Sequence, residues 1–156
     1  MYTCSPVKLT LAENEPNKKT SFTYTPPEDI IIVKALNKAK FPVYLGYSNS
    51  REEYYAIKVF PYDSVSESAC FLNEIAFSGL EHRNIVSILG YETDRQAIFN
   101  DKHTHISYTI MELAPHGDFF DFVSSKKVVF DEKLARTFFH QLIDGISYLH
   151  SKGIYH

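Results

Sequence analysis

A lysine on a predicted strand has the clearest potential for chemistry in this sequence. Residues 54–60 are rich in aromatic and β-branched side chains, and their alternation places Ala56, Lys58 and Phe60 on one face of the strand. The small alanine leaves room for a flat base, and the ammonium two residues farther along can reach phosphate oxygens. The pattern therefore allows a nucleotide site. An edge strand with a solvated lysine is the alternative that this stretch leaves open.

Five segments, in the same order, resemble those of eukaryotic protein kinases. They are the Y-A-I-K stretch at 55–58, which differs from V-A-I-K only in its first residue, the predicted helix at 69–80, the L-E-H-R-N-I-V stretch at 80–86, the hinge-like stretch at 110–118, and 148–154, which is similar to the helix before the catalytic loop. Together these signals are far more specific than any one of them. The chain is identified as a member of the protein kinase superfamily, in its serine/threonine branch.

The resemblance implies an enzyme that uses ATP and Mg2+ to phosphorylate serine or threonine hydroxyls of a protein substrate. The expected catalytic residues are Lys58, which would position the α- and β-phosphates, and Glu74, 74 − 58 = 16 residues later, which would hold Lys58. A solvated Glu74 at the margin of an apolar helix face is the alternative. No metal ligand is assigned within the chain.

The resemblance also implies where the nucleotide would bind. The expected nucleotide-binding residues are Leu36, Val43, Ala56, Lys58, Met111, Glu112, Leu113, Ala114 and Asp118. Adenine would be held by the carbonyl of Glu112 and the N–H of Ala114, between apolar walls. For Asp118, capping a helix N-terminus is the alternative role.

The glycine-rich loop of the family is missing from this sequence. In G-x-G-x-x-G-x-V, backbone N–H groups cover the phosphates, but here Asn37, Ala39 and Pro42 stand nearest the three glycines. Glycine permits positive φ and close backbone approach, and proline has no N–H. We therefore expect a weaker phosphate contact, to which Lys38 and Lys40 could add charge unless they are simply solvated. This departure leaves open a pseudokinase, a binding or scaffolding module that has lost phosphate binding. An unrelated α+β interaction domain is a third reading.

The expected fold class is α+β, a truncated protein kinase-like fold with a five-stranded antiparallel sheet, one packed helix, and the mainly helical start of a larger lobe. Strands are expected at 30–36, 42–47, 54–60, 85–89 and 106–111, with a polar excursion at 92–105. The expected domains are a disordered leader at 1–28 and a partial kinase domain at 29–156, which divides into a small lobe (29–111), a hinge (112–116) and the start of the large lobe (117–156).

Two helices are expected to matter for the site. The first carries Glu74, and Ser78, one turn later, is small and polar where the family has a large apolar residue, so we expect weak anchoring of this helix. The second is a long helix capped by Asp131 and ended by Gly153. Its apolar stripe consists of Leu134, Phe138, Leu142, Ile146 and Leu149.

The last residue, His156, stands where the H-R-D motif of the family would begin. The Asp and Asn of the catalytic loop and the metal-binding Asp are therefore expected beyond it. We interpret the chain as a fragment that is inactive alone. Part of the apolar stripe would then be uncovered, and the chain expressed alone is expected to aggregate.

Composition narrows the class of protein. The 156 residues, 44% hydrophobic and 22% charged, fit one globular unit, and a net charge of -3 gives no reason to expect nucleic acid as a partner. No apolar run approaches the roughly 18 residues that span a bilayer. Two cysteines, Cys4 and Cys70, do not support a disulfide framework, which indicates an intracellular, cytoplasmic location. His103 and His105 lie in a predicted loop without thiolates, so they do not indicate a metal site.

Overall fold

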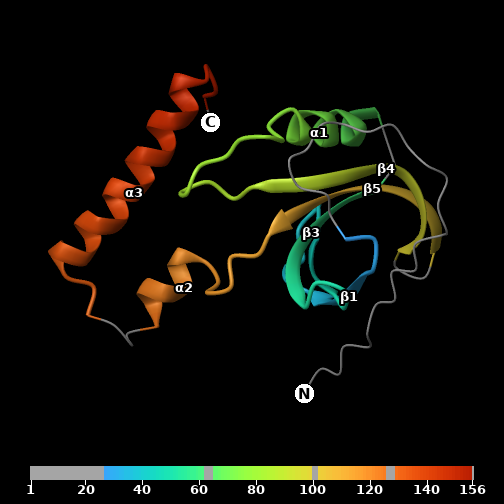
Figure 1. Ribbon diagram of the computed structural model, residues 1–156, viewed down its shortest axis with the longest axis horizontal. Coiled ribbons are helices and arrows are strands. Elements are labelled where there is room, and N and C mark those ends of the chain that lie inside the picture. Colours follow the sequence, from blue (N-terminus) through green and yellow to red (C-terminus); the bar gives the residue numbers. More distant parts are fainter. Residues whose placement is uncertain (1–26, 62–64, 100–101, 126–128, 156) are drawn as a thin grey trace. The chain divides into compact units, whose positions relative to one another are not determined.

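The computed structural model describes residues 27–61, 65–99, 102–125 and 129–155 (Figure 1). The elements in chain order are β1 (Ile30–Ala35), β2 (Val43–Ser48), β3 (Glu53–Pro61), α1 (Val65–Ile75), β4 (Ile88–Phe99), β5 (Lys102–Glu112), α2 (Phe119–Ser124) and α3 (Glu132–Ser151). All but the last two residues of the predicted leader lie outside the described residues, so its predicted disorder is not tested.

The five strands form one antiparallel sheet in the order β1-β2-β3-β5-β4, which is strongly curled (Figure 1). Helix α1 packs against this sheet through Phe71, which is 4% exposed and lies edge-on to Phe60 of β3 with 5.3 Å between ring centroids. The predicted fold class, a five-stranded antiparallel sheet with one packed helix, is confirmed.

The two faces of β3 have different surroundings because successive side chains of a strand point to opposite sides. Tyr55, Ile57 and Val59 lie in the main apolar core. The remaining buried members of that core are Tyr44, Ala97, Ile106, Tyr108 and Ile110. Burial raises the pKa of the phenols of Tyr44 and Tyr108 in this core. The opposite face of β3 carries Ala56, Lys58 and Phe60 and is therefore the face left for a site.

The prediction of a polar loop at 92–105 is wrong. Strand β4 begins at Ile88 rather than Ile85 and continues to Phe99, and β5 returns from Lys102, so the two strands form one long hairpin. The ladder is interrupted between Glu92 and Arg95, where Asp94 has a positive φ of 52°. Polar residues on both faces give no apolar alternation, yet backbone pairing does not require it.

The first helix begins and ends earlier than the predicted range of 69–80. It ends at Ile75, one residue after Glu74, and the chain then turns through hydrogen bonds from Phe77 N–H to the Glu74 carbonyl (3.2 Å) and from Ser78 N–H to the Ile75 carbonyl (3.0 Å). Ser78 therefore lies in a turn and not on the helix. The predicted weak anchoring cannot come from a Ser78 position on the helix.

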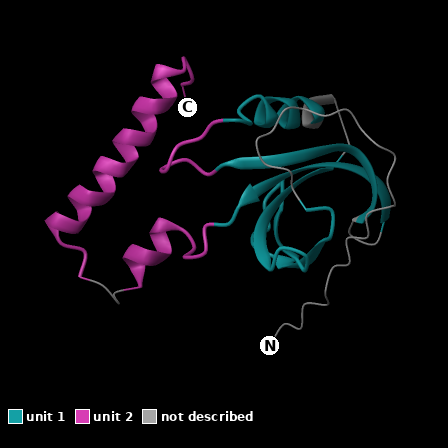
Figure 2. Cartoon of the chain, viewed as in Figure 1, with its two compact units in different colours: residues 1–79, 87–113 teal, residues 80–86, 114–156 magenta. Residues whose placement is uncertain are grey.

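The chain divides into two compact units, which Figure 2 distinguishes by colour. The sheet unit contains residues 1–79 and 87–113, and the helical unit contains residues 80–86 and 114–156. The unit boundary on the C-terminal side thus falls within the predicted hinge, 112–116.

In the helical unit, α3 has the two ends that the sequence predicted. The carboxylate of Asp131 accepts a hydrogen bond from Leu134 N–H at 2.8 Å, which caps the N-terminus. At the other end, Gly153 has a φ of +72°, and Ile154 N–H donates to the Leu149 carbonyl at 3.0 Å. This closing turn requires a left-handed residue, which explains the glycine.

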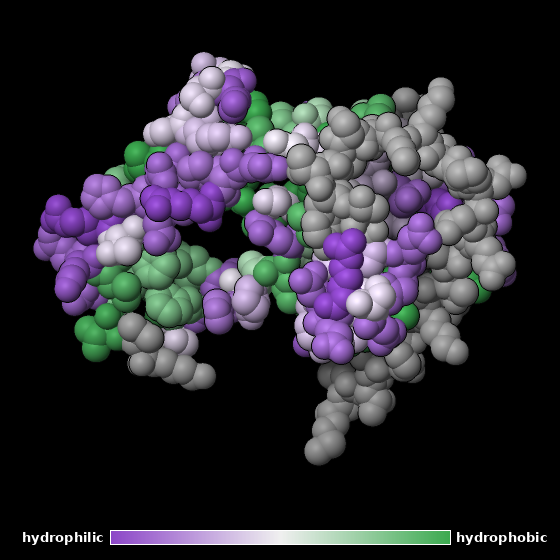
Figure 3. All heavy atoms as spheres, in the orientation of Figure 1, coloured by the Kyte–Doolittle hydropathy of each residue, from purple (hydrophilic) through white to green (hydrophobic). Residues whose placement is uncertain are grey.

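Four phenylalanine rings join α2 to α3 in the helical unit. Phe119 and Phe122 come from α2, Phe130 precedes α3 and Phe138 lies on it, and their centroids are 4.9–6.2 Å apart. Apolar residues gather over this region in the space-filling view (Figure 3). Not all of them are covered, because Phe120 is 76% exposed.

Residues 82–84 pack on α3 around Asp144. Its carboxylate accepts hydrogen bonds from the guanidinium of Arg83 at 3.1 Å and from the side-chain amide of Asn84 at 2.9 Å. Beside it, a Cβ at Gly145 would meet the Asn84 carbonyl oxygen at 3.2 Å, so the close backbone approach favours glycine in mid-helix. Among the described residues, no helix is long and apolar enough to cross a membrane.

Candidate functional site

An ion pair joins the sheet to α1. The Lys58 ammonium, on β3, donates to both carboxylate oxygens of Glu74, on α1, at 2.7 and 2.8 Å. The two side chains are 25% and 27% exposed, so the pair is largely shielded from solvent but part of it remains accessible. A phosphate could therefore reach the ammonium while Glu74 holds it.

The strand register gathers four of the predicted nucleotide-binding residues on one face of the sheet. Lys58 is paired with Val43 on β2 and with Thr109 on β5, and Ala56 is paired with Met111 on β5. Directly opposite residues of antiparallel strands share a face, and Ala56 and Lys58 are two residues apart on one strand. Val43, Ala56, Lys58 and Met111 therefore form a continuous surface across three strands.

Three more predicted residues lie at the edges of this surface in the sheet unit. Leu36 follows β1, is 44% exposed, and donates its N–H to the Val43 carbonyl at 2.7 Å. Glu112 ends β5 and is held twice by Ser87, through its backbone N–H at 3.2 Å and its Oε1 at 2.8 Å. Leu113 follows directly and is half-buried. The sheet unit thus contains seven of the nine predicted nucleotide-binding residues.

The other two, Ala114 and Asp118, belong to the helical unit. Ala114 is exposed. Asp118 is the N-cap of α2, and its Oδ1 accepts a hydrogen bond from Asp121 N–H at 2.7 Å. For Asp118, the structure therefore supplies a contact for the alternative role, which is capping the N-terminus of a helix.

The segment that replaces the glycine-rich loop is closed by a side chain. Asn37 Oδ1 accepts a hydrogen bond from Val43 N–H at 2.8 Å, and the Pro42 carbonyl accepts one from Val59 N–H at 2.9 Å. Val43 N–H is thereby occupied, and Pro42 has no N–H to offer. Loop 37–42 is thus fastened to the sheet at both ends. The sequence marked Asn37 only as a missing glycine, and its bond across six residues was not anticipated.

The lysines of this loop are on the surface. Lys38 and Lys40 are both exposed, and the Lys40 ammonium lies 5.3 Å from the ring centroid of Phe41. A contribution of these two charges to phosphate binding stays a prediction.

A row of aromatic rings that sequence reasoning missed includes Phe60, whose ring lies next to the Lys58 ammonium. The Phe41 ring lies tilted against Phe60 (4.9 Å between centroids), Phe60 meets Phe71 edge-on (5.3 Å), and Phe71 meets Tyr91 edge-on (6.0 Å); we call these four residues the aromatic row. The Lys58 ammonium lies 5.3 Å from the Phe60 centroid, within cation–π range. The available signal was spacing, since Phe60 shares the face of Lys58 on β3.

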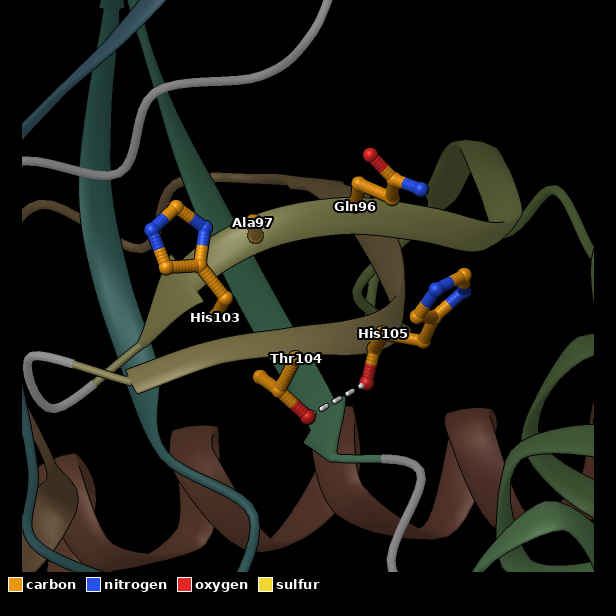
Figure 4. A pocket seen from close by; sticks show the side chains of 5 residues that line it. All are labelled: Gln96, Ala97, His103, Thr104 and His105. Atoms are coloured by element: carbon orange, nitrogen blue, oxygen red, sulfur yellow. Dashed lines mark hydrogen bonds between the residues drawn. The ribbon is translucent and has the colours of Figure 1, made fainter.

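The histidines noted in the sequence line a shallow hollow on the β4–β5 hairpin, with Gln96, Ala97 and Thr104 (Figure 4). His105 Nδ1 lies 2.6 Å from the Asp94 carboxylate, which identifies a hydrogen-bonded pair. Within the part of the chain that the structure describes, no three His, Cys, Asp or Glu side chains are grouped as metal ligands. The hollow is separate from the surface around Lys58.

Comparison with known proteins gives this geometry a family. The protein kinase domain family matches residues 41–156. The chain belongs to the protein kinase family. It is 32% identical over 126 residues to CBL-interacting protein kinase 26 of Oryza sativa subsp. japonica, an alignment that covers 72% of this chain and 23% of that protein. It is 29% identical over 152 residues to Aurora/IPL1-related protein kinase 2 of Caenorhabditis briggsae, covering 94% of this chain and 46% of that protein.

A further relative is the Aurora kinase of Yarrowia lipolytica (strain CLIB 122 / E 150), 26% identical over 159 residues, with 90% of this chain and 40% of that protein covered. The chain thus spans less than half the length of these three kinases. The expected membership in the protein kinase family is confirmed.

Proposed function

We propose that this chain is the ATP-binding part of a protein kinase that transfers the γ-phosphate of ATP to serine or threonine hydroxyls of protein substrates. The observation that carries the proposal is the Lys58–Glu74 ion pair, set beside Ala56 on one face of the sheet. The serine/threonine preference rests on the hinge-like sequence and on relatives such as PLK4 of Xenopus tropicalis, which is named a serine/threonine-protein kinase.

The residues present fit ATP. Lys58 would hold the α- and β-phosphates through the accessible part of its ammonium, while Glu74 fixes that ammonium through two hydrogen bonds. Ala56 is 8% exposed and small, so its neighbourhood can accept a flat base. The apolar walls would come from Leu36, Val43, Met111 and Leu113, and adenine would be held by the Glu112 carbonyl and the Ala114 N–H.

When bound, ATP supplies the phosphoryl group and Mg2+ neutralises its developing charge. The contribution of this chain is positioning and electrostatic stabilisation by Lys58, with Glu74 preventing the ammonium from turning away. We assign no metal ligand to residues 1–156.

We also propose a macromolecular partner and a cellular location for this protein. The macromolecular partner is a protein substrate and not a nucleic acid, because the chain carries a net charge of -3. We place the protein in the cytoplasm, since two cysteines give no sign of a disulfide framework. The scaffold alternative is not favoured, because the comparisons return proteins named as kinases and the Lys58–Glu74 pair is formed.

The proposal is tested by ATP-dependent phosphate incorporation into a protein substrate, using the full-length protein that carries this chain. Lys58→Ala should abolish incorporation because it removes the cation that positions the phosphates. Lys34→Ala is the matched control, since Lys34 is an exposed lysine of β1 and should leave the rate unchanged. Activity that survives Lys58→Ala would refute the role of Lys58, and a wild-type protein without activity would support the scaffold alternative.

A further inference from the structure

Helix α1 contacts the sheet through the buried ring of Phe71 and through the ion pair between Glu74 and Lys58. Among the side chains of α1 that the structure describes, residues 68–75, only Phe71 is buried, while Leu72 is 60% exposed. Glu74 follows Phe71 by three residues and therefore lies on the same side of the helix. Because α1 ends at Ile75, no further helical turn anchors Glu74 from its C-terminal side. The seating of Phe71 therefore determines where the Glu74 carboxylate lies.

Phe71 is seated on Phe60, and Phe60 is in turn covered by Phe41. Phe60 is 2% exposed, with the Phe41 ring 4.9 Å away, tilted by 35°, and the Phe71 ring 5.3 Å away, tilted by 65°. The same Phe60 ring lies 5.3 Å from the Lys58 ammonium. One ring thus touches the loop, the helix and the cation of the ion pair.

Phe41 is presented by a loop that cannot shift freely. The Asn37–Val43 hydrogen bond closes loop 37–42 at 2.8 Å, and the Pro42 carbonyl bonds Val59 N–H on β3 at 2.9 Å. With both ends fastened, the Phe41 ring is held over Phe60 by the loop backbone. Movement of the loop is therefore transmitted to Phe60.

We propose that Phe41 is a positioning residue for the Lys58–Glu74 ion pair, acting through Phe60 and Phe71. The loop that replaces the glycine-rich loop and the helix that carries Glu74 are coupled through these rings. A nucleotide that settles under the loop stabilises the paired arrangement of Lys58, and loss of the Phe41 ring loosens it. The last statement about nucleotide rests on the proposed function, whereas the coupling of Phe41 to the ion pair does not.

The coupling is tested without nucleotide in the full-length protein that carries this chain. The measurement is the rate at which sulfo-NHS-acetate acetylates Lys58, followed by peptide mass spectrometry. An ammonium held by a carboxylate reacts slowly, so Glu74→Gln sets the rate of the unpaired lysine. Phe41→Leu should accelerate acetylation by about two- to fivefold toward that rate, the range expected when one modest contact is lost. Phe41→Tyr keeps the ring at this half-buried position, so it should react like the wild type.

The matched control is Tyr47→Leu. Tyr47 is also an aromatic residue of the sheet unit, and its ring lies tilted against Tyr54 with 4.7 Å between centroids, but neither belongs to the aromatic row. Its substitution should leave Lys58 acetylation unchanged even if it lowers the melting temperature. Should Phe41→Leu fail to fold, Phe41→Met removes the ring with less loss of volume and carries the same expectation.

A second readout is a double-mutant cycle on the binding of the fluorescent nucleotide mant-ATP. If Phe41 acts through the ion pair, Phe41→Leu should weaken binding in the wild type and have little further effect in Glu74→Gln. Unchanged Lys58 acetylation in folded Phe41→Leu, or equal acceleration in Tyr47→Leu, overturns the proposal. Absence of mant-ATP binding in the wild type counts against the proposed function, and acetylation still decides whether Phe41 positions the pair.

Discussion

At the scale of single residues, Glu74 uses both carboxylate oxygens on one ammonium. Glu74→Gln keeps the shape and one acceptor but removes the charge, so Lys58 should lose a charge-assisted contact of about 1.5–3 kcal/mol. We expect kcat/KM for ATP-dependent phosphorylation to fall about ten- to a hundredfold in the full-length protein.

The control for this prediction is Glu132→Gln. Glu132 also pairs with a cation, Arg136 at 2.6 Å, but on the exposed surface of α3, where ion pairs contribute little. Its substitution should leave the kinetics unchanged. A Glu74→Gln protein with wild-type kcat/KM would show that the ion pair has no part in the reaction.

Thr109, opposite Lys58 on β5, is a residue whose substitution should change the stability of the fold. It is fully buried, and its hydroxyl has no hydrogen-bond partner among the described residues. A buried unsatisfied hydroxyl costs about 1–3 kcal/mol, so Thr109→Val, which is close in shape, should raise the free energy of unfolding by about 1 kcal/mol. Chemical denaturation measures the change. Thr93→Val, at an exposed position on β4, should stay within about 0.5 kcal/mol of the wild type, and an equal gain there would contradict the explanation.

At the scale of elements, Asp29 fastens the start of β1 to the end of β2. Its carboxylate accepts hydrogen bonds from the Ser48 hydroxyl (2.6 Å), the Ser50 hydroxyl (2.9 Å) and the Ser50 N–H (2.7 Å). These bonds, the Ser48 hydroxyl first, lower the pKa of Asp29 from 3.8 to about 2. Because the folded pKa lies below the unfolded one, the bonds stabilise the fold above about pH 3.8, and this stabilisation is lost as the pH falls toward 2.

Removal of the Ser48 hydroxyl tests this account. In Ser48→Ala the pKa of Asp29 should rise toward 3.8, as measured by the carboxyl carbon shift in an NMR titration. Ser147→Ala, an exposed serine of α3, serves as the control and should leave the Asp29 titration where it is. An Asp29 pKa that stays near 2 in Ser48→Ala would assign the shift to Ser50 alone.

One segment of the helical unit comes from the middle of the sheet unit's sequence. Residues 80–86 follow α1, which belongs to the sheet unit, yet they pack in the helical unit through Arg83 and Asn84 on Asp144. Asp144 is 60 or more residues away along the chain. Such a contact is specified by side chains that meet only after folding.

At the scale of the whole molecule, apolar side chains remain at the surface. Phe120, Phe139, Leu142 and Val129 are 76%, 60%, 57% and 85% exposed, and all four belong to the helical unit. Clustered apolar surface promotes self-association. We therefore expect the 156-residue chain expressed alone to form aggregates or broad oligomer distributions, measured by light scattering after size exclusion.

Charged residues introduced on the exposed apolar surface of α3 should reduce this aggregation. Phe139→Glu combined with Leu142→Glu should raise the monomer fraction, because both side chains are more than half exposed and their loss leaves the interior intact. Gln141→Glu, exposed on the same helix, adds charge without removing apolar surface and should help less. A monodisperse wild-type monomer with a sharp, cooperative thermal transition would contradict the prediction.

The sequence by itself determined the features that depend on short intervals along the chain. The alternation around Lys58 placed Ala56 and Phe60 on its face, and Asp131 and Gly153 located the ends of α3 within two residues. The pairing of Lys58 with Glu74 was predictable only through the family resemblance, because periodicity alone leaves Glu74 at the margin of a helix face.

The tertiary structure decided what depends on residues that meet from distant elements. The sequence did not predict most of strand β4 or the start of β5, because polar residues on both faces give no alternation of apolar and polar side chains. Backbone pairing between the strands does not require such alternation. The hydrogen bond from Val43 N–H to Asn37 Oδ1 and the contact between the Phe41 and Phe60 rings arise from chain reversals that bring separate segments together. Local patterns record which residues each element presents, but only the packed chain determines which of them touch.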